Sequence, residues 1–579
     1  MILIFLLLGV CLSVNFSHEK KTETDSLLEA EPTRTAVLPT NSPTPAPTEA
    51  PVELVVYSQL SSFQGEQQGW FAKLLLDKFN VKLQILPELP DAEEELDRAD
   101  IIVFGGVGSG TDNMYRSAAE AGKLLDWEAD NLLAEQGAYI LEHMAKALEY
   151  NRTLQPETGK IYGLGHRVAL SADSIDDFVY TWDIRWDLYQ QLGYPEVKNL
   201  EDFATVLGQM KQLCPTDENG EETYAMSLWS EWDETMVFYV KSMIAAYYGY
   251  EECGLGLYDT TTGSFYGALE IGGPYLQMVR FFNTLYRNGL LDPESKTQNY
   301  AEGLAKLNCG GAFFSVHRYS GSMAYNTDNH MKAERYMASL VPEEATPLTY
   351  GLSTTGGGRI WAINAETKYP ELCMKILNWL CTPEGVMSSA YGPQGVIWDY
   401  DEEGNTYFTE FGLLCREDGD VMMTGEYEGT SYKEGFSQIN NVTWNIYSEN
   451  PDSNGEPYYW EHWRSNVPEA ACAMEQDWRM QTGELSTREY LKNQNYLVVP
   501  ATAYEAAELT EELSAAQKAV AECIIHGTWK AIYADSDEEF AAVWMKMTED
   551  AIEKGYTECI NFWTLEAAGR YTLEEGARE

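Results

Sequence analysis

The chain has 579 residues, and its 39 Lys and Arg against 91 Asp and Glu give a net charge of −52. A chain of this length is expected to form several domains or a few large lobes. So negative a charge repels phosphate backbones and anionic membrane surfaces, which excludes nucleic acid as a partner. Hydrophobic residues make up 44% of the chain, which is typical of a folded globular protein and excludes a disordered one.

The first ten residues, Met1 to Val10, are almost wholly apolar and are followed by Cys11. They are too few to span a bilayer but have the length of the apolar part of a signal peptide. The segment ending in Cys11 resembles a bacterial lipobox, although Val10 departs from the small residue that this pattern prefers. Residues 1–11 are therefore predicted to be a lipoprotein signal peptide, lipidated at Cys11. An ordinary secretory signal that is cleaved farther along the chain is the alternative.

Residues 12–52 are predicted to be a tether, because the stretch from Glu29 to Pro51 is rich in Pro and Thr and has no apolar core. A tether after a lipidated cysteine holds the folded body on the extracellular face of the cell membrane. The other nine cysteines are scattered and form no C-x-x-C pair. They predict neither a disulfide framework nor a structural zinc site.

The folded body begins with alternating strand and helix patterns. Apolar strands are predicted at 54–57, 81–86 and 100–104, and a helix with one apolar stripe is predicted from Trp70 to Phe79. This order is typical of an α/β layer with a largely parallel sheet. In such sheets ligands bind beyond the carboxyl ends of the strands, so the loops 58–69 and 105–115 are candidate ligand loops.

Four further amphipathic stretches predict helices at 274–286, 369–381, 514–533 and 538–554. Asn199 is a predicted N-cap of a helix that extends to Lys211, and Pro370 falls in the first turn of its helix. Asp399 to Asn405 is interpreted as a hairpin turn with solvated charges.

Several segments resemble the extracellular solute-binding proteins of family 1, which are similar to the maltose-binding protein. They are Val179–Tyr194 (VYTWDIRWDLYQQLGY), Pro215–Trp229 (PTDENGEETYAMSLW), Leu285–Val316, and Gly356–Trp398 with its GGGRIWAIN and YGPQGVIWDY stretches. The resemblance covers most of residues 53–565. It implies a periplasmic-binding-protein-like fold of two α/β lobes, with a hinge and a ligand cleft between the lobes. It also implies that the protein delivers a solute to an ABC permease.

The resemblance maps onto this chain as a first lobe of residues 53–168 and 345–395. The second lobe is expected to comprise residues 169–344 and 396–579, including the C-terminal helices. The protein is expected to be a monomer that touches the membrane only through its lipid anchor. No cofactor is expected.

Sugars bind proteins through stacked aromatic rings together with polar groups that meet the hydroxyls. The segment Trp229 to Asp233 offers both, where the family often places a stacking residue of the second lobe. Trp232 is the first candidate, with core packing as the competing interpretation, and Asp233 is a candidate beside it. Trp229 ends an apolar strand, which favours the core. Arg318, after the predicted strand 312–316, would pair with an anionic sugar or with a surface carboxylate.

Four more candidates are weaker. Asp112 and Tyr115 lie in the Gly-rich loop after the 100–104 strand, which lacks the spacing of a phosphate-binding loop. Trp361 follows Gly356–Arg359 in a strand near the hinge, where packing is the competing interpretation. Trp444 is a looser candidate, expected from the second lobe.

Asp217 to Glu222 loosely resembles a calcium loop of some relatives, but it fits the ligand spacing poorly and is interpreted as a polar turn. The sequence has no HExxH, GxSxG or P-loop motif, and with 91 carboxylates a chance pair of acids carries no weight. We therefore expect a non-enzymatic protein that captures an oligosaccharide for an ABC transporter. The alternatives are a surface glycan-binding or scaffolding lipoprotein without an importer, and a carbohydrate-active enzyme.

Overall fold

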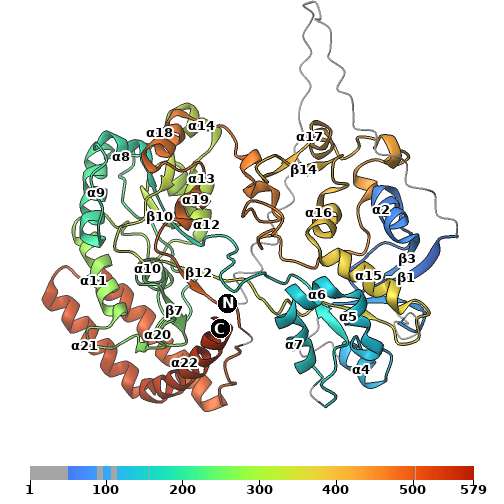
Figure 1. The fold of residues 1–579 in the computed structure, drawn as a ribbon. Coiled ribbons are helices and arrows are strands. Elements are labelled where there is room, and N and C mark those ends of the chain that lie inside the picture. The colour runs from blue at the N-terminus through green and yellow to red at the C-terminus, as the bar shows by residue number, and fades with distance from the viewer. Residues whose placement is uncertain (1–49, 88–95, 106–113, 156, 503, 579) are drawn as a thin grey trace, which may run out of the picture. The chain divides into compact units, whose positions relative to one another are not determined.

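The structure is a computed structural model that describes residues 50–87, 96–105, 114–155, 157–502 and 504–578. Residues from Pro51 onward form one compact unit, which contains two large hydrophobic cores. We call the parts around these cores the first and the second lobe, and Figure 1 shows the elements of each lobe gathered around its own strands. The signal peptide, Cys11 and most of the tether lie outside the described residues and remain predictions.

The first lobe is built on a mixed sheet of six strands in the order β2-β3-β1-β4-β13-β5. The predicted parallel arrangement is confirmed for β1, β3 and β4, and β13 runs antiparallel to both β4 and β5. The strands span β1 (Val52–Ser58), β2 (Gly65–Glu66), β3 (Val81–Pro87), β4 (Ile101–Phe104), β5 (Gly163–Gly165) and β13 (Ile360–Ile363).

Hydrophobic cores cover both faces of this sheet. One strand contributes to both cores, because its alternate side chains point to opposite sides. Leu54 and Val56 of β1 belong to the large core, whereas Tyr57 belongs to a smaller core on the other face. The helices of the large core are α2 (Gly69–Phe79), α5 (Leu132–Gln136), α6 (Ala138–His143), α7 (Ala145–Thr153), α15 (Pro370–Cys381) and α16 (Pro383–Tyr391). α4 (Met114–Glu120) covers the smaller core.

The first lobe also includes residues that were expected in the second. Ile397, Trp398, Tyr432 and Trp463 are buried in the same core as β1 and α2, so the segment 396–463 returns to the first lobe instead of leaving it at residue 395. It carries the predicted turn at 399–405 between β14 (Trp398–Tyr400) and β15 (Thr406–Phe408), followed by α17 (Glu410–Glu417). The aromatic side chains of the segment 396–463 pack against α2 and α16. Local sequence patterns do not predict these contacts between distant parts of the chain.

The second lobe contains a three-stranded antiparallel sheet in the order β10-β6-β11. β6 (Tyr180–Arg185) lies between β10 (Phe314–His317) and β11 (Met337–Ser339). A second small sheet is formed by β7 (Tyr250–Cys253), β8 (Gly256–Asp259) and β9 (Phe265–Gly267). The helices are α8 (Trp186–Gln191), α9 (Leu200–Leu213), α10 (Phe238–Tyr248), α11 (Pro274–Arg287), α12 (Tyr300–Asn308), α13 (Ser322–Tyr325), α14 (Asp328–Lys332), α18 (Ala473–Thr482) and α19 (Thr487–Lys492).

The predicted N-cap of α9 is confirmed, since the Asn199 side chain accepts from the amides of Glu201 and Asp202.

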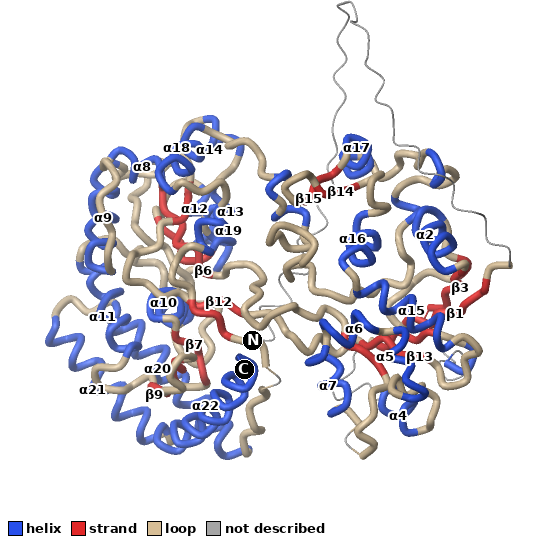
Figure 2. Tube along the Cα trace, in the orientation of Figure 1, coloured by secondary structure: helices blue, strands red, loops and turns tan. Residues whose placement is uncertain are grey.

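Three long helices close the chain, α20 (Glu511–Ile532), α21 (Asp537–Glu553) and α22 (Tyr556–Arg578), and Figure 2 shows them beside one another in the second lobe. The first two confirm the predicted helices at 514–533 and 538–554. Val520, Ile524, Trp529 and Phe540 lie in the same core as β6 and α10, so these helices are part of the second lobe. The third was not predicted, although Tyr556, Cys559, Ile560, Trp563 and Ala567 recur at helical spacing on the face that packs against the second lobe.

The segments that pass between the lobes pair with one another. Ala169 N donates to Ser353 O at 2.8 Å, and Leu352 N donates to Ser174 O at 2.7 Å. Next to them, β12 (Leu348–Tyr350) pairs in parallel with β16 (Leu497–Val499). Two α/β lobes joined by such crossover segments make this a periplasmic-binding-protein-like fold. Among the helices of the described residues, none has both the length and the apolarity of a membrane span.

Candidate ligand-binding site

The second lobe carries a group of five adjoining rings, Trp232, Phe238, Tyr300, His317 and Tyr319, which we call the aromatic platform. The indole of Trp232 stacks on Tyr300, with ring centroids 4.9 Å apart and an interplanar angle of 30°. Its other platform neighbours are Phe238 at 5.4 Å and Tyr319 at 6.0 Å. These four rings are partly exposed, so the platform combines a packed base with accessible aromatic surface.

His317 is the buried member of the platform and has an exposure of 2%. Its imidazole is stacked between Phe238 and Tyr319, with centroid distances of 5.4 and 5.0 Å and interplanar angles of 22° and 21°. Burial lowers the pKa of His317 to about 4, although the backbone of Val179 opposes this shift. Neither ring nitrogen has a partner of hydrogen-bond geometry among the described residues. His317 is therefore a neutral ring that supports Tyr319 and Phe238.

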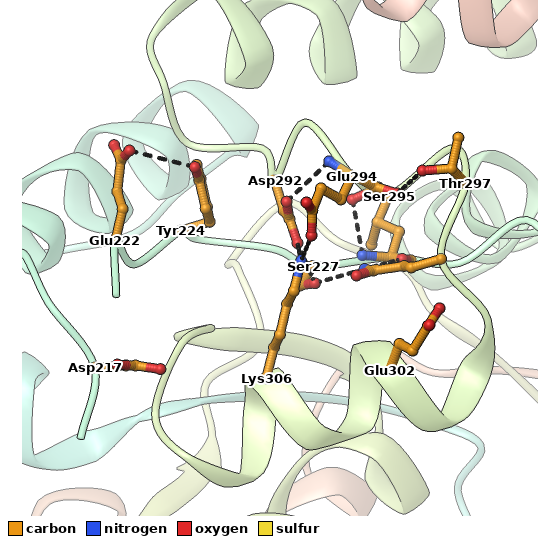
Figure 3. Close-up of polar contacts among 12 residues, drawn as sticks. Asp217, Glu222, Tyr224, Ser227, Asp292, Glu294, Ser295, Thr297, Glu302 and Lys306 are labelled. Carbon is orange, nitrogen blue, oxygen red and sulfur yellow. Dashed lines mark hydrogen bonds and ion pairs between the residues drawn. The ribbon is translucent and has the colours of Figure 1, made fainter. Parts of the chain in front are cut away.

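A buried polar network holds the segment that leads to Trp232 (Figure 3). Asp292 Oδ2 accepts from Ser227 Oγ and from Lys306 Nζ, both at 2.7 Å, and Asp292 Oδ1 accepts from Glu294 N at 2.9 Å. Ser295 Oγ accepts from Leu228 N at 3.0 Å. Because Ser227 and Leu228 are fixed by side chains of the 292–306 region, the chain enters the Trp229–Trp232 loop in one defined direction.

The position of Tyr300 is fixed by the start of α12. Asn299 forms a capping box with Glu302, so the first turn of the helix has its amide partners. Glu231 Oε2 accepts from Tyr300 N at 3.0 Å. The residue before Trp232 is thus bound to the residue on which Trp232 stacks, and the two halves of the stack are tied together.

Asp233, predicted as a ligand residue, has its carboxylate bound within the protein. Oδ1 accepts from Phe238 N at 2.7 Å, and Oδ2 accepts from Trp529 Nε1 at 2.7 Å. Burial raises the pKa of Asp233 to about 6, and these two hydrogen bonds oppose the rise. Asp233 therefore connects the loop to α10 and α20.

Trp229, the other predicted tryptophan of this segment, is buried with an exposure of 2%. It meets Trp232, Tyr239 and Tyr300 edge to face at centroid distances of 4.9 to 5.2 Å. Trp229 also lines a small cavity of about 10 Å³, which is roughly the room that one water molecule needs. Trp229 lies beneath the platform as part of the core.

Three of the other candidates are not brought to the platform, and Trp444, expected from the second lobe, belongs to the core of the first. Tyr115 is fully buried on α4 and donates from its hydroxyl to Asn151 Oδ1 at 3.0 Å. Trp361 and Trp444 have exposures of 2% and 1% and lie in the core of the first lobe. Asp112 lies outside the described residues.

Arg318 is exposed and directly precedes Tyr319 of the platform. Its guanidinium forms an ion pair with Asp177, with 3.4 Å between Nη1 and Oδ2. This contact matches the interpretation of Arg318 as a partner of a surface carboxylate. It leaves a charged pair beside the aromatic rings.

The predicted polar turn after Pro215 does not offer a metal site. Asp217 Oδ1 accepts from the amides of Asn219 and Glu221 at 2.8 and 2.9 Å, and Oδ2 faces the thiol of Cys309 at 3.0 Å. The carboxylate is thus used by its own turn and does not fit a calcium loop. Across the described residues there is no group of three or more His, Cys, Asp or Glu side chains placed to hold a metal ion.

Phe238, Tyr300 and Tyr319 were not predicted from the sequence. One usable signal was present for Tyr300, because Asn299-Tyr300-Ala301-Glu302 has the spacing of a capping box. That spacing places Tyr300 at the first position of a helix. Nothing in the sequence indicates that it lies against Trp232, since this contact joins segments that are distant in the chain.

No family model and no curated protein matches the chain. Among solved structures, the N-glycan transport solute-binding protein NgtS from Streptococcus pneumoniae has 13% identity and a TM-score of 0.41, covering 90% of this chain and 99% of that one. An HMO-binding, ABC-transporter-associated solute-binding protein from Bifidobacterium longum infantis has 12% identity and a TM-score of 0.44, covering 91% and 100%. The S. pneumoniae ABC-transporter substrate-binding protein FusA in complex with kestose has 15% identity and a TM-score of 0.41, covering 91% and 99%. Because these values are low, the assignment of the fold depends on the lobes and crossover segments of this chain.

Proposed function

We propose that this protein is an extracellular substrate-binding lipoprotein that captures an oligosaccharide and delivers it to an ABC transporter permease. The observation that supports the proposal most directly is the aromatic platform of Trp232, Phe238, Tyr300, His317 and Tyr319 in the second lobe. Four of its rings are partly exposed, and the loop that carries Trp232 is held by a hydrogen-bonded network.

The chemistry of the platform suits a sugar ring. A pyranose has an apolar C–H face that packs on an aromatic ring and a rim of hydroxyls that need polar partners. Glu231 and Arg318 are exposed residues that directly adjoin Trp232 and Tyr319 in the chain. Stacking on Trp232, with hydroxyl contacts from such neighbours, is the binding mode that we propose.

The proposed delivery step uses the two lobes. In this fold class a ligand shifts the population between open and closed arrangements of the lobes about the crossover segments. The lipid on Cys11 and the tether 12–52 would keep the body near the permease. The loss of uptake of one oligosaccharide after deletion of the gene would support this part of the proposal.

A thermal-shift screen of the purified protein tests sugar capture. The panel contains maltotriose, 1-kestose, chitotriose, xylotriose and trigalacturonate. A sugar present at about 100 times its dissociation constant should stabilise the folded state by about 2.7 kcal/mol. A shift with one class of sugar, confirmed by calorimetric titration, supports the proposal. The absence of both a shift and a binding heat with every member contradicts it, as does release of shorter sugars by the pure protein, which would indicate an enzyme.

A further inference from the structure

The loop that presents Trp232 is closed by the residue that follows it. Asp233 N donates to Ser230 O at 3.1 Å, which makes residues 230–233 a turn with Trp232 inside it. The Asp233 carboxylate extends from this turn to two helices. It accepts from Phe238 N at the start of α10 and from Trp529 Nε1 of α20, both at 2.7 Å.

The second of these contacts joins the platform to the C-terminal helices. Trp529 is buried, with an exposure of 7%, and its ring stacks on Tyr533 at a centroid distance of 6.2 Å. Tyr533 in turn donates from its hydroxyl to Asp292 O at 2.8 Å. Two groups hold the Trp232 loop in place, the Asp233 carboxylate and the network around Asp292. α20 contacts the first through Trp529 and the second through Tyr533 at its C-terminal end.

The end of α20 is itself firmly fixed to the second lobe. The Asn283 side-chain amide of α11 donates to Ala531 O, Ile532 O and Ala534 O at 3.3, 3.0 and 2.8 Å. Trp529 lies two residues before the first of these carbonyls, and Tyr533 lies between the last two. The indole N–H that meets Asp233 is thus held on a rigid element and not on a mobile loop.

We propose that Asp233 and Trp529 are positioning residues, which fix the orientation of Trp232 so that helix α20 contributes to sugar affinity without touching the sugar. This inference depends on the proposed function, because it assigns a role in the same site. Loss of either group would leave the 230–233 turn attached through fewer contacts, and Trp232 would sample orientations that do not stack on the ligand. The cost would then appear as weaker binding of an unchanged set of sugars.

The surroundings of Asp233 make the effect sensitive to pH. The charge of Lys241 of α10 acts on Asp233; Lys241 forms an ion pair with Glu252 of β7, and the phenol of Tyr275 of α11 faces the same region. A carboxyl that gains a proton accepts hydrogen bonds more weakly. Because the pKa of Asp233 is about 6, the two contacts should weaken as the pH falls through this value.

Two variants and one control test the proposal. Trp529→Phe removes the N–H donor and keeps a ring, and Asp233→Asn keeps the shape but leaves one of the two donors without an acceptor. Trp544→Phe of α21 is the matched control, because Trp544 is equally buried at 7% exposure and its indole nitrogen has no hydrogen-bond partner within the described residues.

The first readout needs no ligand. Hydrogen–deuterium exchange of peptides covering residues 229–238 should be faster in Trp529→Phe and Asp233→Asn than in the wild type, and unchanged in Trp544→Phe. The second readout is calorimetric titration with the sugar that gives the largest thermal shift in the panel. Trp529→Phe should bind it about tenfold more weakly, whereas Trp544→Phe should retain the wild-type affinity.

The pH profile separates positioning from general packing. The affinity of the wild type should decline as the pH falls from 7 to 5, and the affinity of Asp233→Asn should be low and nearly constant over the same range. Wild-type exchange and wild-type affinity in Trp529→Phe would overturn the proposal. If the exchange of 229–238 increases as expected but no sugar binds even the wild type, it is the proposed function that fails.

Discussion

The indole of Trp232 and the phenol ring of Tyr300 stack on each other 4.9 Å apart, and the residue before the tryptophan binds the backbone amide of the tyrosine. One contact is aromatic and the other is a hydrogen bond, so neither ring can shift without disturbing the other segment. This pair gives the second lobe a fixed aromatic surface. A sugar that stacks there would meet rings whose orientation is already set before binding.

Replacement of Trp232 by alanine should weaken oligosaccharide binding by about 1–3 kcal/mol, because one stacking contact is lost. The fold should be retained, since the side chain is only partly buried. Calorimetric titration with the tightest sugar of the panel measures the effect. Trp563→Ala in α22 is the control, as Trp563 is also a partly buried tryptophan of the second lobe. An unchanged affinity in Trp232→Ala would remove this residue from the site.

The two asparagine caps offer a matched pair of variants. Asn299→Ala and Asn199→Ala should each lower the free energy of unfolding by about 1 kcal/mol, because each side chain accepts from backbone amides at a helix start. Only Asn299→Ala should also weaken sugar binding, since α12 begins with Tyr300. Urea denaturation and calorimetric titration on both proteins measure the two effects. Equal affinities in the two variants would show that Tyr300 does not contribute to binding.

His317→Phe should alter the pH dependence of stability. The pKa of His317 is lowered by burial to about 4, below its ordinary value of about 6.5. The unfolded chain therefore takes up a proton at a higher pH than the folded protein does. His317 thus contributes stability above pH 6.5 that is lost as the pH falls from 6.5 to 4.

The free energy of unfolding of His317→Phe should consequently rise relative to that of the wild type over this range, by up to about 3 kcal/mol. Burial also lowers the pKa of His166 to about 4 and that of His462 to about 3, so the variant removes only part of the acid sensitivity. Urea titrations at pH 7, 6 and 5 supply the measurement. If the difference in the free energy of unfolding between His317→Phe and the wild type is the same at all three pH values, the prediction is wrong.

Arg570 of α22 is expected to be important for stability. Its guanidinium forms ion pairs with Glu251 and Glu574, whose side chains are 9% and 1% exposed. Arg570→Met would take the shared cation from two buried carboxylates, leaving Glu574 only Arg578 at 3.9 Å, so the free energy of unfolding should fall by about 3–5 kcal/mol. Arg287→Met breaks the exposed pair with Asp537 and should cost no more than about 1 kcal/mol. Similar urea midpoints for the two variants would argue against a buried ion cluster.

Local patterns predicted much of the chain correctly. The strands β1, β3 and β4, the helices α2, α9, α11, α15, α20 and α21, and the turn at 399–405 lie where the sequence analysis placed them. Each depends on interactions between residues close in the chain, such as an apolar stripe, a capping asparagine or a charged turn. The sequence also singled out Trp232, because an aromatic residue beside carboxylates is typical of sugar recognition.

The burial of the other candidates was decided by the tertiary structure. Trp361 and Trp444 lie in the core of the first lobe because segments 345–395 and 396–463 both contribute to the core of β1 and α2. Asp233 faces inward because Trp529, far along the chain, supplies its hydrogen-bond donor. In α22, Arg570 pairs with Glu251, a residue far away in the chain, as well as with Glu574 of the same helix.

By itself the sequence determined those helices and strands that follow from periodicity and capping within a few residues. Only the tertiary structure decided which aromatic rings stay accessible. The accessibility of a ring depends on which side chains from distant parts of the chain cover it, and these contacts cannot be predicted from local sequence. The platform exists because Glu231 meets Tyr300 and Asp233 meets Trp529, two contacts that form only when the second lobe is folded.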